Sequence, residues 1–135
     1  RKTAHEILER VGNYAKVMAS HTALGDKQRF VDAELVREIA KRGGLVGLTP
    51  ANVFFPTMEK YVNAFAEVNQ MAGSGEAAAV ATDFGGLDAH HLFSDLDEIG
   101  KLGLLAERLS SQTGLSDEEV AAIMYGNVER IVKQL

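Results

Sequence analysis

The chain has 135 residues, of which 46% are hydrophobic, which is enough apolar material for one folded domain with a core. Its formal net charge of -5 and its scattered basic residues argue against a nucleic-acid-binding surface, which normally clusters lysine and arginine. The absence of cysteine excludes disulfides, thiolate metal ligands and a cysteine nucleophile. No apolar run approaches the roughly 18 residues of a membrane span, and no signal peptide is recognisable, so a cytoplasmic location is the default expectation.

The predicted elements alternate between helix and strand along the chain. In order, we expect a helix from residue 3, a strand at 17–20, a helix from 32, a strand at 45–49, a helix at 57–72, a strand at 77–82, a helix at 94–111 and a last helix from 116 that breaks near 126. Helices between successive strands imply parallel strands with right-handed crossovers. Because each strand is apolar throughout, we expect both faces of the sheet to be covered.

Three parallel strands are few for a complete domain of this class. A (β/α)8 barrel uses roughly 250 residues, and the predicted elements match its last three or four units. The chain also begins at Arg1 without a methionine. We therefore expect residues 1–135 to be a single segment, the C-terminal portion of a (β/α)8 TIM-type barrel, with the N-terminal part absent. Open strand edges and apolar surface then predict a companion polypeptide or segment, or a homo-oligomer.

Three polar residues follow the predicted strands directly, namely His21, Thr49 and Asp83. Parallel α/β proteins bind their ligands at the carboxyl ends of the strands, so these residues are candidates for a site. A neutral imidazole is a good zinc ligand, and a carboxylate can move a proton or bind metal. A single histidine at a strand end is also often structural, so its position alone leaves both interpretations open.

Two loops contain further candidates. Asp88, His90 and His91 carry metal-binding groups, but adjacent histidines in an extended loop point in opposite directions and seldom bind one ion. We therefore expect that loop to face solvent, near enough to Asp83 to touch a substrate. Phe54 and Phe55, in the loop after the second strand, either line a pocket or, as is more usual, pack in the core or against the missing part of the barrel.

Four short motifs occur in a fixed order: SHT at residues 20–22, GGLVG at 43–47, ATDFGG at 81–86 and LSDEEVAAIMYGNVERI at 115–131. In this order and at about this spacing they resemble the C-terminal half of the membrane dipeptidase family, the renal dipeptidase-like metallopeptidases of family M19. The resemblance covers nearly the whole chain from residue 16 onward.

The resemblance implies a zinc-dependent (β/α)8 barrel that hydrolyses dipeptides, including some with a D-residue on the carboxyl side. His21 would match a zinc ligand of a site with two zinc ions, which activate a bridging water and polarise the peptide carbonyl. Asp83 would match the residue that assists proton transfer to the leaving amine. Arg29 would match the arginine that holds the substrate carboxylate, with Lys27 as the alternative cation.

The sequence leaves two alternatives to a dipeptidase. The other zinc ligands of such a site, an H-x-D pair, a bridging glutamate and another histidine, would lie on earlier strands, and Gly85 stands where the family motif has a second acid. The chain is therefore expected to be part of a metal-dependent hydrolase for dipeptides or similar small amides. The alternatives are a catalytically degenerate barrel with a binding or structural role, and a metal-dependent barrel hydrolase of other amides, esters or lactones.

Overall fold

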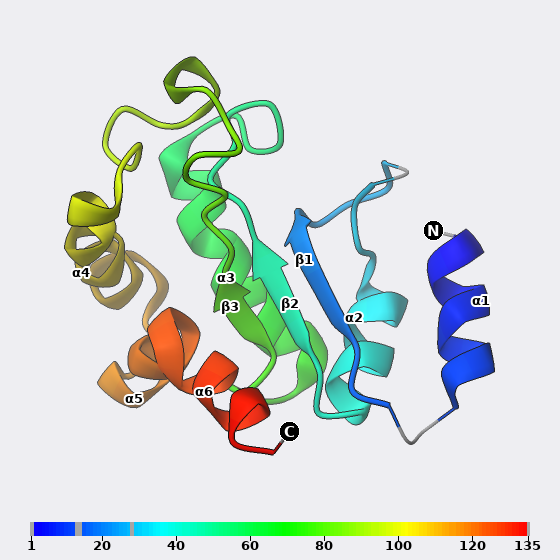
Figure 1. Ribbon diagram of the computed structural model, residues 1–135. Helices are drawn as coiled ribbons and strands as arrows, with labels where there is room; N and C mark the ends of the chain where they lie inside the picture. The colour runs from blue at the N-terminus through cyan, green and yellow to red at the C-terminus, as the bar shows by residue number, and fades with distance from the viewer. Residues whose placement is uncertain (1, 13–14, 28, 135) are drawn as a thin grey trace.

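The computed structural model describes residues 2–12, 15–27 and 29–134 of the chain (Figure 1). Three parallel strands form one sheet in the order β1 (Met18–Thr22), β2 (Leu45–Leu48) and β3 (Ala78–Val80). The remaining elements are α1 (Lys2–Val11), α2 (Ala33–Lys41), α3 (Met58–Ala72), the short 3-10 turns η1 (Ala89–His91) and η2 (Ile99–Lys101), α4 (Leu102–Thr113), α5 (Asp117–Ala121), the π-helical segment η3 (Ala122–Gly126) and α6 (Asn127–Val132). Helix and strand therefore alternate as far as β3, as the sequence predicts.

Side-chain caps fix the starts of three helices. The Asp32 carboxylate accepts a hydrogen bond from the backbone N–H of Leu35 at 2.9 Å, and Thr57 caps α3 in the same way. Ser116 and Glu119 form a reciprocal capping box at the start of α5. Each cap satisfies an N–H group that the first helical turn leaves without a partner, so these helix starts follow directly from local sequence.

The segment before α4 differs from the prediction, because the helix expected over residues 94–111 begins only at Leu102. The Lys101 ammonium donates to the backbone carbonyl of Ser94 at 2.9 Å and to the Asp97 carboxylate at 2.5 Å. The hydrogen bond from Lys101 is the main reason that the pKa of Asp97 is lowered. Asp97, which the expected helix would place in its first turn, therefore helps to hold a loop instead.

The two faces of the sheet pack against different helices. Val46 and Leu48 belong to the main core, which they share with residues of α2 and α3, whereas Leu45 clusters with Ala79 and with Ile131 of α6. Figure 1 shows α3 and α6 on opposite sides of the sheet. The buried Tyr61 hydroxyl of α3 donates to the backbone carbonyl of Leu48 at 3.2 Å. Burial raises the pKa of Tyr61, so its hydroxyl stays protonated and holds the carboxyl end of β2 against α3.

The expectation that every strand is covered on both faces is confirmed for β2 and is wrong for β1. All four residues of β2 are buried, but Met18, Ser20 and His21 of β1 are exposed, Met18 to 51%. Within the described part of the chain, β1 pairs with β2 alone and forms one edge of the sheet. The described residues therefore leave the apolar start of β1 partly uncovered. Among the described residues, no helix combines the length and hydropathy that crossing a membrane requires.

The motif GNVERI, residues 126–131, links the amino ends of β2 and β3 through side-chain hydrogen bonds. The buried Asn127 amide donates to the backbone carbonyls of Gly75 and Ala78, both at 2.9 Å. The Arg130 guanidinium donates to the carbonyls of Gly43 at 3.1 Å and Glu76 at 2.9 Å, which lie just before β2 and β3. The asparagine and the arginine in this motif therefore have a structural role.

Replacing Asn127 by alanine should destabilise the fold by roughly 2–4 kcal/mol, because it leaves the partly buried carbonyl of Gly75 and the buried carbonyl of Ala78 without their donor. The free energy of unfolding is measured by urea denaturation of the protein. The exposed Gln112 of α4 provides the control, Gln112→Ala, which should change stability by no more than about 0.5 kcal/mol. Equal stability of the two variants would contradict the role given to Asn127.

Candidate functional site

His21 lies in an irregularity of β1 and not after the strand end. Ala19 pairs with Val46 and Thr22 pairs with Leu48, so β1 has one residue more than β2 between these pairs. His21 takes up the irregularity with a φ of 57°, in the left-handed region. A bulge of this kind re-aims a side chain and is common beside functional sites. Here it directs the exposed imidazole of His21 into the cavity described below.

Asp83 lies in a tight turn after β3. The backbone N–H groups of Gly86 and Leu87 donate to the Asp83 carbonyl at 2.9 and 3.1 Å. The carboxylate lies directly against Gly86, where a Cβ atom would come within 2.1 Å of Oδ1 of Asp83. The glycine at position 86 therefore makes room for the carboxylate, which gives the DFGG sequence a physical reason.

The His21 and Asp83 side chains face each other at the carboxyl end of the sheet. Nε2 of His21 and Oδ1 of Asp83 are 3.9 Å apart, and the side chains are 51% and 34% exposed. This separation exceeds a hydrogen bond but permits an ion pair when the imidazole is protonated. Among the residues that the structure describes, these two alone combine a positive φ with a side chain. Such backbone strain concentrates at functional sites, where the surrounding structure maintains it.

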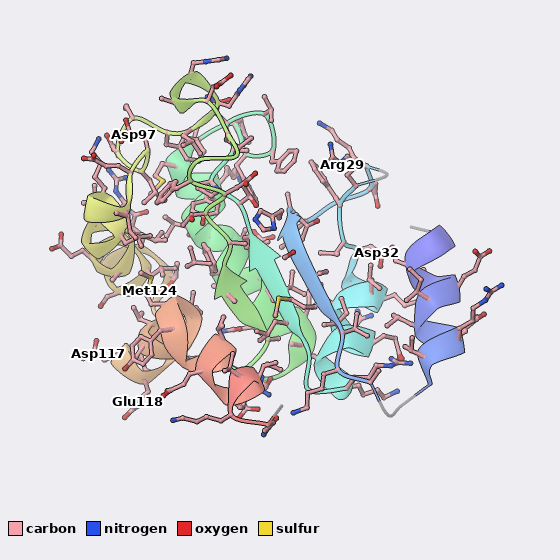
Figure 2. All side chains as sticks on the ribbon, viewed as in Figure 1. Arg29, Asp32, Asp97, Asp117, Glu118 and Met124 are labelled. Atoms are coloured by element: carbon pink, nitrogen blue, oxygen red, sulfur yellow. The ribbon has the colours of Figure 1, made fainter. Side chains whose placement is uncertain are left out.

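Arg29 lies on the loop between β1 and α2, beyond the carboxyl end of β1 (Figure 2). The buried Thr22 hydroxyl donates to the backbone carbonyl of Arg29 at 2.9 Å and so fixes this part of the loop. The Arg29 side chain lines the same cavity as His21 and Asp83. The alternative cation, Lys27, places its ammonium 5.4 Å from the centre of the Phe30 ring. Of the two cations, Arg29 is thus the one that lines the cavity.

One cavity of about 290 Å³ collects the three residues predicted from the sequence. Its lining consists of His21, Arg29, Thr49, Val53, Phe54, Asp83, Leu87 and His91. Phe54 also contacts the Phe30 ring edge-on, with ring centres 5.3 Å apart, whereas Phe55 belongs to the core. The volume is close to the lower limit for small-molecule sites and suits a compact polar ligand with a small apolar part.

Two further residues of the cavity were not assigned a role from the sequence. The expectation that the loop of His91 faces solvent is wrong at that residue, because His91 is half-buried and lines the cavity. Thr49 is 1% exposed, and its hydroxyl finds no hydrogen-bond partner among the described residues. Its position directly after a buried strand made it a candidate in the sequence, but no chemical role follows from a threonine there.

The donor atoms of the cavity suit a metal of the zinc type. His21 and His91 supply imidazole nitrogens, and Asp83 supplies a carboxylate, which are the ligand types that zinc binds besides thiolate. In the described part of the chain, three such ligand groups lie close together only at Asp88, His90 and His91. Among the described residues, His21, Asp83 and His91 therefore do not form such a group by themselves, and a metal at His21 would need further ligands.

Comparison with known proteins agrees with this geometry. A sequence model of the family described as membrane dipeptidase (Peptidase family M19) matches residues 2–135. No curated protein matches the sequence significantly. An amidohydrolase structure from Pseudomonas aeruginosa is similar over 98% of this chain and 49% of its own, with a TM-score of 0.78 and 21% identity. A structure of the dipeptidase AC, a metallopeptidase of family M19, is similar over 92% of this chain and 38% of its own, with a TM-score of 0.80 and 15% identity.

The chain therefore spans less than half the length of either solved structure. At these identities the likeness shows the fold. It confirms the fold class expected from the sequence, in which about three parallel strands with flanking helices form a portion of a larger (β/α)8-type barrel.

Proposed function

Because the chain belongs to the membrane dipeptidase family, peptidase family M19, we propose that it is the C-terminal part of a zinc-dependent barrel hydrolase that cleaves dipeptides or similar small amides. The observation that carries this proposal is the single cavity that collects His21, Arg29 and Asp83 at the carboxyl ends of parallel strands. Ligands bind at that end in barrels of this class.

His21 is proposed as one ligand of a metal centre, expected to hold two zinc ions in the complete site. Its imidazole is half-exposed, and Nε2 lies too far from Asp83 for a hydrogen bond, so this nitrogen is available for a metal. When bound, zinc supplies an activated water and polarises the amide carbonyl. The bulge in β1 contributes the fixed direction of the ring.

Asp83 is proposed to hold the proton that the leaving amine requires. An amide nitrogen leaves only after it has been protonated, and a carboxyl group within reach of it can deliver that proton. The Asp83 carboxylate is 34% exposed and faces the cavity from the turn after β3. Because Gly86 has no side chain, the Asp83 carboxylate can lie directly against the backbone of the turn.

Arg29 is proposed to bind the free carboxylate of the substrate. The planar guanidinium pairs with a carboxylate through two parallel hydrogen bonds, which gives both affinity and orientation. Arg29 lines the cavity from the β1–α2 loop, while Asp83 lines it from the turn after β3. A cation in the cavity would attract a substrate that ends in a carboxylate, and this favours dipeptides over lactones or neutral esters.

The remaining ligands and strands are proposed to come from an N-terminal part of the barrel, either in the same polypeptide or in a companion chain. The exposed outer face of β1 and the lengths of the two solved structures support this arrangement. An adjoining strand along β1 would cover Met18 and bring further ligands beside His21.

Chelation tests the proposed function directly. Stripping the complete protein of metal should abolish hydrolysis of a panel of dipeptides, and added zinc should restore it. The same panel includes blocked dipeptide amides, esters and lactones, and the free carboxylate should raise kcat/KM by at least tenfold because Arg29 then has its partner. Activity that survives chelation would exclude the zinc-dependent mechanism. Inactivity on the entire panel, with zinc bound, would favour a degenerate barrel with a binding role.

A further inference from the structure

A second group of metal-binding side chains lies at the rim of the cavity, in the loop after β3. Asp88, His90 and His91 each offer one ligand atom, and these atoms all lie within 4.8 Å of one another. The sequence predicts an extended loop, and this is wrong, because the loop turns through η1. The turn brings the ring centres of His90 and His91 within 3.9 Å of each other. The two adjacent imidazoles therefore lie together and do not point apart.

The loop that carries these side chains is held from outside by Asn52, which follows β2. The Asn52 amide donates to the backbone carbonyl of His90 at 2.8 Å and to that of Leu92 at 3.3 Å, and the Asn52 N–H donates to the carbonyl of His91 at 2.9 Å. Within the loop, the His91 N–H donates to the Asp88 carbonyl at 2.8 Å. These hydrogen bonds hold the backbone of all three ligand residues in place, which lowers the cost of binding an ion.

We propose that Asp88, His90 and His91 form a binding site for a divalent transition ion, with zinc as the best match, separate from the metal site at His21. Two imidazoles and one carboxylate are ligands that zinc accepts, whereas magnesium and calcium prefer oxygen alone. Zinc–nitrogen bonds of about 2.0 Å place tetrahedral ligands roughly 3.4 Å apart, so the ligand atoms, which lie within 4.8 Å of one another, would have to close by at most about 1.4 Å. Asp88 and His90 are exposed and free to rotate by that amount.

The position of His91 connects this rim site to the cavity. Its ring lines the cavity together with His21 and Asp83, and it is also one of the three rim ligands. An ion at the rim fixes that ring and adds positive charge at the mouth of the cavity, which favours anionic ligands. Three protein ligands also leave one position of the ion open to water or to a ligand group.

The proposal is tested with zinc as the only probe, titrated against a chromophoric chelator into the metal-stripped complete protein. The wild type should bind one zinc more than His90→Ala or Asp88→Asn, or should fill that site at least a hundredfold more tightly. Asn52→Ala, which keeps all three ligands, should weaken the same site about tenfold to a hundredfold because the loop loses its support. His5→Ala, in α1, is the control and should retain full binding.

A second readout works on the unmodified chain and separates the rim from the site at His21. Zinc should protect His90 and His91 from acylation by diethyl pyrocarbonate, as read by peptide mass spectrometry, while His5 is modified equally with and without zinc. The protection should persist in a His21→Ala variant. Unchanged zinc stoichiometry in the rim variants, or equal modification of His90 and His91 with and without zinc, would overturn the proposal and leave the two rings as a simple stacked pair.

Discussion

Replacing His21 by alanine in the complete protein is expected to abolish metal-dependent hydrolysis, with a loss of at least about a thousandfold in kcat/KM. The imidazole is proposed as a metal ligand, and an alanine at position 21 supplies no donor atom in its place. The bound metal, measured by elemental mass spectrometry on the same samples, should fall together with the activity.

The matching control is His5→Ala, because His5 lies in α1 and does not line the cavity. It should retain both activity and the metal content of the wild type. His21 is exposed, so its loss should leave the fold intact, and this is checked by circular dichroism of the same preparations. Undiminished hydrolysis by the His21→Ala protein would sink the proposed mechanism, whatever its metal content.

Placing a single methyl group at position 86 should be nearly as damaging as removing the carboxylate of Asp83. A Cβ at residue 86 would lie 2.1 Å from Oδ1 and 2.8 Å from Cγ of Asp83, so the carboxylate must leave its position. The backbone of Gly86 does not require glycine, since its φ lies outside the left-handed region, and the effect is therefore steric. We expect Gly86→Ala and Asp83→Asn each to lower kcat by about a hundredfold to ten-thousandfold, as loss of a positioned acid does.

The glycine in α4 gives a sharp comparison, because a Cβ at Gly103 would meet nothing within 4 Å. Gly103→Ala should leave kcat unchanged and should not reduce stability. The metal content of Gly86→Ala should equal that of the wild type, which separates a displaced proton donor from a lost metal. Full turnover by Gly86→Ala alongside an inactive Asp83→Asn would mean that the reaction tolerates a displaced carboxylate.

Several local features of the structure could be predicted from the sequence. The caps at Asp32, Thr57 and Ser116 depend on contacts between residues three apart, which a sequence shows directly. The placement of the candidate site follows from a general property of parallel sheets, whose carboxyl ends share one edge. For this reason His21 and Asp83 are expected at one edge of the sheet, whereas Arg29 is expected there only from the resemblance to the family. One cavity collects all three residues.

The features that could not be predicted depend on contacts between distant parts of the chain. The direction of His21 depends on how β1 pairs with β2, because the bulge exists only relative to its partner strand. The proximity of His90 and His91 depends on Asn52, which lies 38 residues before His90 in the chain. Periodicity and propensity describe neighbours along the sequence, and they contain no information about such pairings.

The irregularity in β1 makes the number of residues as informative as their identity. Between the pairs at Ala19 and Thr22, β1 inserts one residue more than β2 needs, and this extra residue accommodates the turn of the backbone at His21. Deleting Ser20 would restore a regular ladder in which Thr22 still pairs with Leu48, and His21 would then alternate with its neighbours instead of being aimed by the bulge. A change that alters no chemical group of the site would therefore remove it, whereas many substitutions at Ser20 would leave it in place. The number of residues between Ala19 and Thr22 therefore determines the direction of His21.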